Sequence, residues 1–479
     1  MAEYIFSVLR SGNVQLEEYN GDGTEIRIPS HYEGRPVTVI GDNAFSWQSG
    51  IRTVTIPDTV TTIGEAAFSW CESLERVDIP DSVKIIGEWA FIGCSSLTEI
   101  TLPHQVRKIN YSTFQGCTAL RTVSLPDGIR SIGPEAFSEC RSLHTLRLPA
   151  CLTSLGDCAF ASCDHLTSIE LPDTLCELGH NVFSGCFSLA EFILSENHPV
   201  YQVTDGVLID RTASQLLFYP FQQSASEYVI PEGVKIIGEE AFANRTRLES
   251  VVFPASLTTI EEKAFYGCRA LKQVALPDSV TRVATSAFHS CTALEEALLP
   301  KNLQVLEYSL FYACGALARV KLPEGLKIIA ACAFSGCGSL DQLDFPEGLI
   351  EIGESAFEGC RSLTEATLPD SLETLGVHTF GSCIQLDTVT LGQGVKTLPV
   401  GLFSKCENLN CVNLPDKLET IESEAFGNCE NLLTLQIPSS VAEIAADAFE
   451  GCRHLMIFAE AKSYAIEFAD DYGILCSEL

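Results

Sequence analysis

Apolar residues recur along the chain at a constant step, and phenylalanine marks the period most clearly. A first run of seven phenylalanines is spaced by 23 residues, and after a gap a second run of ten resumes the same step. The runs are Phe45, Phe68, Phe91, Phe114, Phe137, Phe160 and Phe183, then Phe242, Phe265, Phe288, Phe311, Phe334, Phe357, Phe380, Phe403, Phe426 and Phe449. Self-similarity at such a period is the signature of a repeat architecture, so the chain is predicted to be a solenoid.

Other positions keep the same phase. Cysteine follows the phenylalanine by three residues in 15 units, and leucine follows it by six residues in 16 units. A strand-like alternation comes next: Val77 and Ile79 point one way, whereas Arg76 and Asp78 point the other. Pro80 cannot donate to a ladder and ends the strand. Stacked units would pair these strands, which predicts a right-handed stack of 17 repeats, mainly parallel β with turns and short irregular or helical segments.

The period breaks in three places, and these breaks define the predicted domains. An open solenoid end exposes its core and an unpaired strand edge, so a cap is expected at each terminus. Asp-Gly between apolar runs predicts a hairpin in the central break, and helical spacing predicts a helix near the C-terminus. The predicted parts are an N-terminal β-hairpin cap (1–24), a first repeat block (25–195), a hairpin-like insertion (196–230), a second repeat block (231–456) and a C-terminal cap (457–479).

The repeating unit resembles a known family. Phe-x-x-Cys-x-x-Leu-x-x-Val-x-Leu-Pro, followed by Ile-Gly-x-x-Ala-Phe, is similar to the BspA-like leucine-rich repeats over about residues 25–460. The resemblance implies a leucine-rich-repeat solenoid with a protein-interaction role and no enzyme activity. Members of that family are mainly bacterial surface or secreted proteins, and some bind host matrix proteins. The resemblance therefore implies an adhesin-like or host-interacting protein.

The charge of the chain narrows its partners. Asp and Glu total 63 against 30 Lys and Arg, which gives a formal net charge of −33. Such a surface repels phosphate backbones and anionic lipid headgroups, so no nucleic-acid partner is expected. No apolar run approaches the ~18 residues of a membrane helix, so no membrane insertion is expected. The N-terminus shows no secretory signal, which favours the cytoplasm, whereas the resemblance implies the cell surface or secretion.

No constellation of residues indicates catalysis or a cofactor. Of the 21 cysteines, 15 form the phased ladder and are interpreted as buried, reduced thiols. There is no Cys-x-x-Cys pair, no His-x-x-x-His spacing, and no Walker or dinucleotide motif. The chain is therefore predicted not to be an enzyme, with no catalytic residues, no metal ligands and no cofactors.

An acidic residue follows the strand-ending proline in ten units. Turn propensity explains Pro-Asp at this position, and a calcium-binding ridge is the alternative interpretation. The ten residues are Asp58, Asp81, Asp127, Asp173, Glu232, Asp278, Glu324, Glu347, Asp370 and Asp416.

One outward position of the predicted sheet changes character in the middle of the chain. It is polar in the first six units and in the last six before the C-terminal cap, but apolar in the five between. Stacked together, the five residues would form a continuous apolar stripe: Ile193, Val229, Val252, Ala275 and Leu298. The insertion adds apolar residues beside it, among them Phe218, Tyr219 and Phe221. One interpretation is that the insertion covers the stripe. The other is that the stripe binds a partner or a second copy of the chain, with the aromatic residues as anchors.

These observations predict a non-catalytic protein–protein interaction scaffold that binds a protein partner through its sheet face. The alternative is a carbohydrate or matrix-polymer binding protein. That class normally uses exposed aromatic side chains, and the outward sheet positions considered above contain none.

Overall fold

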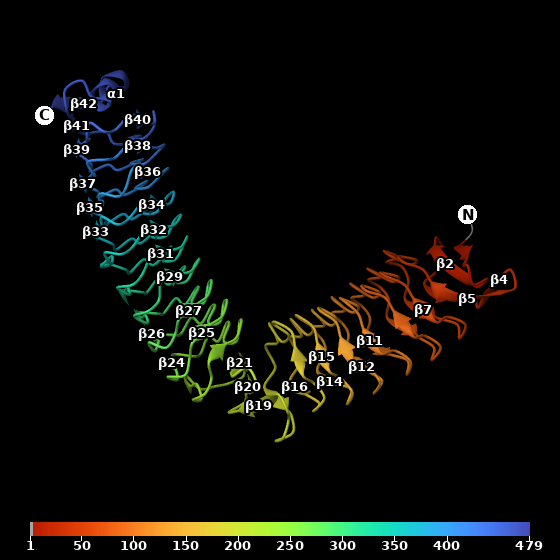
Figure 1. The fold of residues 1–479 in the computed structure, drawn as a ribbon. Helices are drawn as coiled ribbons and strands as arrows, with labels where there is room; N and C mark the ends of the chain where they lie inside the picture. The colour runs from red at the N-terminus through yellow and green to blue at the C-terminus, as the bar shows by residue number, and fades with distance from the viewer. Residues whose placement is uncertain (1–2) are drawn as a thin grey trace. The chain divides into compact units, whose positions relative to one another are not determined.

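The computed structural model describes residues 3–479, which form the turns of a parallel β-solenoid. The chain divides into two compact units: unit 1 is Met1–Thr212 with Leu217–Gln223, and unit 2 is Ala213–Leu216 with Ser224–Leu479. Within each unit, Figure 1 shows short strands of successive turns lying side by side. The predicted fold class is confirmed, but the count of 17 is low. The chain makes about 20 turns, because turns at the ends and in the insertion lack the phased phenylalanine.

In unit 1, one row of strands forms the sheet face, and most turns add a shorter strand in a second row. The face consists of β3 (Glu25–Arg27), β6 (Thr53–Thr55), β8 (Arg76–Asp78), β10 (Glu99–Thr101), β12 (Thr122–Ser124), β14 (Thr145–Arg147), β16 (Ser168–Glu170) and β18 (Glu191–Ile193). The second row consists of β5 (Arg35–Ile40), β7 (Thr62–Ile63), β9 (Ile85–Ile86), β11 (Lys108–Ile109), β13 (Ser131–Ile132), β15 (Ser154–Leu155) and β17 (Glu177–Leu178).

Three short antiparallel pairs lie where the period breaks. At the N-terminus, β1 (Tyr4–Val8) pairs antiparallel with β2 (Val14–Tyr19), which in turn pairs parallel with β5. β4 (His31–Tyr32) folds back on the start of β5 and accommodates the extra residues of the first turn. In the central break, β19 (Tyr201–Thr204) and β20 (Val207–Asp210) form a hairpin whose turn is Asp205-Gly206, and β21 (Gln215–Phe218) follows.

Unit 2 repeats the two-row arrangement. Its face consists of β22 (Glu227–Val229), β24 (Ser250–Val252), β26 (Gln273–Ala275), β28 (Glu296–Leu298), β30 (Arg319–Lys321), β33 (Glu365–Thr367), β35 (Thr388–Thr390), β37 (Cys411–Asn413), β39 (Thr434–Gln436), β41 (Met456–Ala459) and β42 (Leu475–Glu478). Its second row consists of β23 (Ile236–Ile237), β25 (Thr259–Ile260), β27 (Arg282–Val283), β29 (Val305–Leu306), β31 (Ile328–Ile329), β32 (Glu351–Ile352), β34 (Thr374–Leu375), β36 (Thr397–Leu398), β38 (Thr420–Ile421) and β40 (Glu443–Ile444).

The C-terminus of unit 2 ends in a helix and a strand. Helix α1 (Tyr464–Tyr472) is the single helix of residues 3–479, and none of these residues forms a helix long and apolar enough to span a membrane. Gly473 ends α1 in the left-handed conformation, as C-terminal glycines do. The segment 457–479 starts inside β41, which pairs with β39, so the elements beyond the regular turns are α1 and β42.

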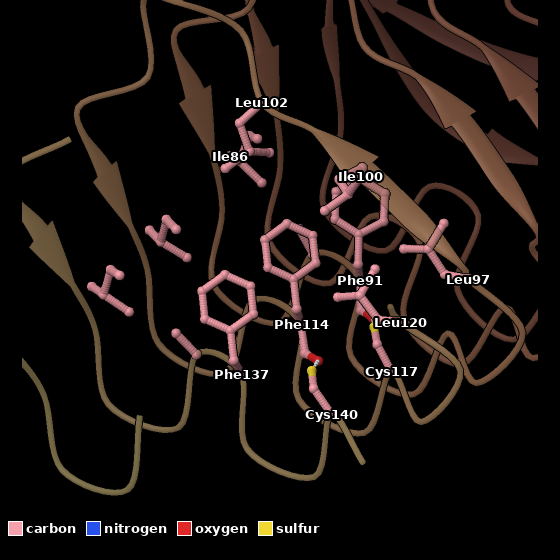
Figure 2. Packing of buried hydrophobic residues seen from close by; sticks show 14 of the residues in the cluster. Ile86, Phe91, Leu97, Ile100, Leu102, Phe114, Cys117, Leu120, Phe137 and Cys140 are labelled. Atoms are coloured by element: carbon pink, nitrogen blue, oxygen red, sulfur yellow. Dashed lines mark hydrogen bonds between the residues drawn. The ribbon is translucent and has the colours of Figure 1, made fainter. Parts of the chain in front are cut away.

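Phenylalanine rings form the centre of the core in both units. Successive rings lie 4.9–6.0 Å apart in unit 1 and 4.8–5.9 Å apart in unit 2, most of them nearly parallel. Figure 2 shows this row at Phe91, Phe114 and Phe137. This spacing approaches the ~4.8 Å between strands, so each turn contributes one ring.

The loop around each phenylalanine is held by hydrogen bonds to the next turn. The backbone N–H groups of Asn43, Phe45 and Trp47 donate to carbonyl oxygens of the following turn, each at 2.8 Å. To present three N–H groups in the same direction, the loop places the residues two before and two after the phenylalanine at positive φ in nearly every unit. Glycine is frequent at the second of these positions because it adopts that conformation without steric cost.

The glycine of the Ile-Gly step is needed for close packing between turns. Gly87 does not have a positive φ; a Cβ atom there would lie 2.6 Å from the backbone of Gly64 and Glu65 in the preceding turn. The glycine therefore permits close approach of adjacent turns.

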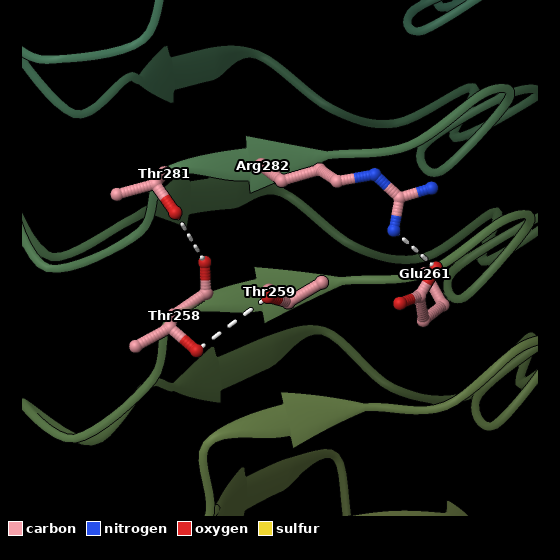
Figure 3. Close-up of polar contacts among 5 residues, drawn as sticks. All are labelled: Thr258, Thr259, Glu261, Thr281 and Arg282. Carbon is pink, nitrogen blue, oxygen red and sulfur yellow. Dashed lines mark hydrogen bonds and ion pairs between the residues drawn. The ribbon is translucent and has the colours of Figure 1, made fainter.

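Polar side chains on the second row connect neighbouring turns at their solvent side. Figure 3 shows Arg282 donating to Glu261 at 2.7 Å, while the Thr281 hydroxyl donates to the Thr258 carbonyl oxygen at 3.4 Å. Such exposed ion pairs each contribute about 0–1 kcal/mol, so the buried stack carries the stability of the unit.

Candidate functional site

The apolar residues singled out on the sheet face are exposed. The side chains of Val229 and Val252 are 64% and 57% exposed, and those of Ile193, Ala275 and Leu298 are also exposed. Their strand neighbours Tyr228, Val251, Val274, Ala297 and Phe192 are buried. This is the alternation expected of a strand with one face on the core.

Four of the five residues lie at the same position of four consecutive strands in unit 2. Val229 is paired with Val252 on the adjacent strand, and Ala275 is paired with Leu298. On the next strand, β30, the residue paired with Leu298 is the charged Lys321, so the row ends at Leu298. We call Val229, Val252, Ala275 and Leu298 the apolar row; at ~4.8 Å per strand it runs for about 14 Å.

Ile193 belongs to the other unit. It lies on β18 of unit 1, where its strand partner is Glu170 of β16. The structure therefore brings together four of the five residues predicted for the stripe.

The aromatic residues of the insertion do not have the exposed position expected of binding anchors. Phe218 is 7% exposed and Tyr219 is 3% exposed, so both side chains are packed in the interior and offer little surface to a partner. Phe218 packs edge-on against Phe183 and Phe192, the last rings of unit 1.

Phe221 is half-buried and packs edge-on against Phe187 at 4.9 Å. The side chain of Gln222 fastens the same segment by donating to the Phe187 carbonyl oxygen at 3.0 Å. These residues close the core of unit 1, because its phenylalanine stack has no further ring after Phe183.

The polar surroundings of the apolar row are of mixed charge. Arg319 pairs with Glu296 next to Leu298, at 3.3 Å between Nε and Oε1. A hollow of about 250 Å³ adjoins Leu298 and is lined also by Arg319, Lys321 and Asp341. An apolar strip with a charged rim is the usual composition of a protein-binding surface.

The phased cysteines are a structural ladder. In all 15 units the Sγ–H donates to the carbonyl oxygen of the phenylalanine in the preceding turn, at 3.0–3.3 Å. All are free, and all but the half-buried Cys452 are buried. Burial raises the pKa of the Cys117 thiol and of the Cys383 thiol to about 12, so the reactive thiolate is scarce at neutral pH.

Thiol titration tests this interpretation. In the native protein we expect only the three exposed cysteines, Cys151, Cys176 and Cys411, to react rapidly with a disulfide reagent. In denaturant all 21 cysteines should react, because unfolding exposes every thiol to the reagent. Rapid native reaction of most ladder cysteines would show that they are accessible and would contradict the buried ladder.

Some of the acidic residues after the strand-ending prolines, among them Glu232, accept hydrogen bonds from the backbone of the next turn. The carboxylates of Asp278 and Asp370 accept hydrogen bonds from the N–H groups of Lys301 and Gln393, one turn further on. A second bond from the Lys301 ammonium lowers the pKa of Asp278. Among residues 3–479, no group of three or more His, Cys, Asp or Glu side chains is placed to hold a metal ion. The geometry favours the turn interpretation.

His198 is the one buried histidine among residues 3–479, and its contacts fix a structural role. Its Nδ1 accepts hydrogen bonds from the N–H groups of Val200 and Tyr201, and its Nε2 donates to the Pro172 carbonyl oxygen. This assigns the neutral imidazole with the proton on Nε2, and it ties the start of the insertion to the last turns of unit 1.

Exposed aromatic side chains do occur, but on the loops, which the examination of outward sheet positions missed. The exposed Trp47 and Trp70 stack in unit 1, and in unit 2 the half-buried Tyr266 and His289 stack with the exposed Tyr312. Each set recurs at the 23-residue step at a fixed distance from the phenylalanine. Inspecting every phased position, beyond the strand positions, would have found both.

The repeat profile described as BspA type leucine rich repeat region matches in six copies, at residues 19–141, 108–206, 214–341 and 327–456. Because these matches cover most of the chain, the protein belongs to the BspA-type leucine-rich-repeat family, as its repeating unit predicted. A search of curated proteins finds no match.

Solved structures of bacterial repeat proteins resemble the chain. A leucine-rich cell surface protein from Faecalibacterium prausnitzii is 29% identical, covering 86% of this chain and 93% of its own, with a TM-score of 0.49. A leucine-rich repeat protein from Bacteroides ovatus is 26% identical, with coverages of 100% and 99% and a TM-score of 0.41. The pneumococcal vaccine antigen PcpA is 18% identical, with coverages of 100% and 98% and a TM-score of 0.39.

Proposed function

We propose that this protein is a non-catalytic scaffold that binds a protein partner through the sheet face of unit 2. The observation that carries the proposal is the apolar row, four exposed apolar side chains at the same position of consecutive strands, on a face whose other outward positions are mostly polar. Soluble proteins seldom expose a contiguous apolar patch without a use. The repeat fold supports it as well, because solenoids offer long rigid surfaces that mostly bind other molecules.

The apolar row is too small to form a stable protein interface by itself. A stable, specific protein interface buries about 800 Å² on each partner, more than four side chains provide. The partner therefore also contacts the polar outward residues beside the row, such as Glu227, Gln273 and Glu296. The apolar row supplies the desolvated centre, and these residues supply the rim.

The family supports an adhesin-like, host-interacting role for such a scaffold. In that role the partner is a host protein, and the second copy of the chain is the competing occupant. The mixed charge around Leu298, with Arg319 and Lys321 beside Asp341, suits a protein rather than a polyanion.

Two aspartates placed in the row test this function. We expect Val252→Asp combined with Ala275→Asp to fold normally, since both side chains are exposed, and to bind the partner at least about a hundredfold more weakly, since hot-spot residues each contribute about 2 kcal/mol or more. Pull-downs from host and bacterial extracts with the parent protein identify the partner, and calorimetry compares the variants.

The matched control is Thr367→Asp with Thr390→Asp, which adds the same charge at the same strand position further along the face. Loss of binding in the row variant alone supports the site. Equal binding by the row variant and the parent removes the site, and loss of a dimer in light scattering assigns the row to self-association. Unfolding of the row variant would show that the row is core.

A further inference from the structure

The three tryptophans of the chain occupy positions that their side chains do not favour. Trp47, Trp70 and Trp89 lie in the first three phenylalanine-marked turns, and all have positive φ, at 63°, 57° and 54°. Bulky residues rarely adopt this conformation. At the position of Trp47 and Trp70, two residues after the phenylalanine, the next two turns have Gly93 and Gly116.

Burial does not compensate for this conformation at two of the three. Trp47 is 68% exposed and Trp70 is 40% exposed. Neither backbone preference nor core packing explains two adjacent exposed indoles. The turn itself imposes the positive φ in nearly every unit, so what the fold does not require is a bulky, exposed indole at two adjacent positions where the next two turns have glycine.

The two indoles are stacked face to face, so each covers the inner face of the other, and Trp47 is the more exposed of the pair. Their ring centroids lie 5.3 Å apart with an interplanar angle of 11°. On the far side of Trp70 lies Gly93, where a Cβ atom would come within 2.5 Å of the indole ring. Hydrogen bonds from the Trp47 and Trp70 N–H groups to the next turns, at 2.8 and 2.7 Å, hold the backbone beneath each ring. The stack is thus rigid before any ligand binds.

We propose that the Trp47–Trp70 stack is a binding platform for a neutral oligosaccharide. A pyranose ring has an apolar face of C–H groups that packs on an exposed indole, while its hydroxyl groups remain free for hydrogen bonds. The exposed residues that follow each tryptophan are polar: Ser49 and Gly50 in one turn and Glu72 in the next. A carboxylate accepts strong hydrogen bonds from hydroxyl donors, and Glu72, two residues after Trp70, supplies an exposed one.

Other ligands that stack on aromatic rings fit less well. Nucleic-acid bases bring phosphates, which the net charge of −33 repels, and sulfated or sialylated glycans meet the same repulsion. A protein hot spot needs surrounding contacts that exclude water, whereas the residues around these rings are polar and exposed. A neutral sugar needs neither a basic surface nor an apolar surround.

The experiment uses the full chain and five neutral oligosaccharides: cellotetraose, xylotetraose, mannotetraose, galactotetraose and chitotetraose. We expect at least one to bind and to change the tryptophan emission, because two of the three indoles of the chain are in the platform. In the double variant Trp47→Gly, Trp70→Gly, binding should weaken about ten- to a hundredfold, as when one stacked ring is removed. This variant should fold, since it copies Gly93 and Gly116 and relieves the positive φ of two bulky residues.

Glu139→Gly is the matched control, because Glu139 occupies the same loop position in a later turn. It should bind the sugar like the parent, and so should the Val252→Asp, Ala275→Asp variant, which separates this site from the protein-binding surface. Failure of all five sugars to bind at millimolar concentration overturns the proposal. So does binding without a change in emission, unchanged binding by the tryptophan variant, or binding of tetramethylammonium, a cationic ligand of aromatic rings, in place of any sugar.

Discussion

Replacing Phe334 by alanine is expected to lower the free energy of unfolding of unit 2 by about 3–5 kcal/mol. The Phe334 side chain is fully buried and lies between Phe311 at 5.5 Å and Phe357 at 5.3 Å. Alanine would leave a cavity inside the stack, which neighbouring turns cannot fill because their backbones are hydrogen-bonded to one another. Each ring pair also contributes about 0.5–1.5 kcal/mol beyond burial.

Urea denaturation followed by circular dichroism measures the loss. Phe345→Ala is the control: Phe345 touches the same stack, edge-on to Phe357 at 5.5 Å, but it is only half-buried and should cost less. Repeat proteins are stabilised by nearest-neighbour interfaces, so hydrogen exchange should accelerate most in the turns around residues 311–357. Tryptophan fluorescence, which reports on unit 1 alone, should keep its midpoint. A Phe334 variant as stable as the parent would mean that the stack is not the source of stability.

The repeating part of the fold was predictable from the sequence because the same pattern of apolar and polar residues recurs in every turn. Phe91, Cys94 and Leu97 in one turn predict the burial of their equivalents in every other turn, so a local ambiguity in one unit is resolved by the rest. The alternation of Arg76, Val77 and Asp78 likewise predicted which side of the sheet faces solvent. The apolar row was found by this reasoning, since its exposure follows from the strand phase alone.

The parts that occur once were harder to predict. Phe218 and Tyr219 look like exposed anchors in the sequence, yet they are buried, because the end of the unit 1 stack needs rings to cover Phe183. That need is a property of tertiary structure, and no periodicity reveals it. The turn at residues 341–346 shows the opposite case: its pattern is regular, and nothing in the structure explains why it has no strand.

The tryptophan platform was missed for a related reason. Trp47 and Trp70 recur at the 23-residue step, so the phased loop positions reveal the pair, but the sequence of a loop does not indicate which side chains face solvent. Their positive φ and their stacking become evident only in the structure. The exposure of a loop side chain therefore becomes evident only in the structure, whereas the exposure of a strand side chain follows from the period of the sequence.

Deleting residues 460–479 is expected to cause unit 2 to aggregate. The deletion removes α1 and β42, and with them Phe468, which covers the last ring of the stack at 6.1 Å from Phe449. It also frees the edge of β41, which β42 pairs along its whole length. Exposed core together with an unpaired strand edge is the combination that promotes association between chains. Light scattering should show large species, and the melting temperature should fall by several degrees.

Two smaller changes separate the contributions of core and edge. Removing residues 474–479 frees the β41 edge but keeps α1, so it should promote association with little loss of stability. Phe468→Ala keeps β42 but uncovers Phe449, so it should cost about 3–5 kcal/mol while leaving the protein monomeric. If the full deletion were monomeric with unchanged melting, the regular turns would be stable without α1 and β42, and neither element could be regarded as a cap.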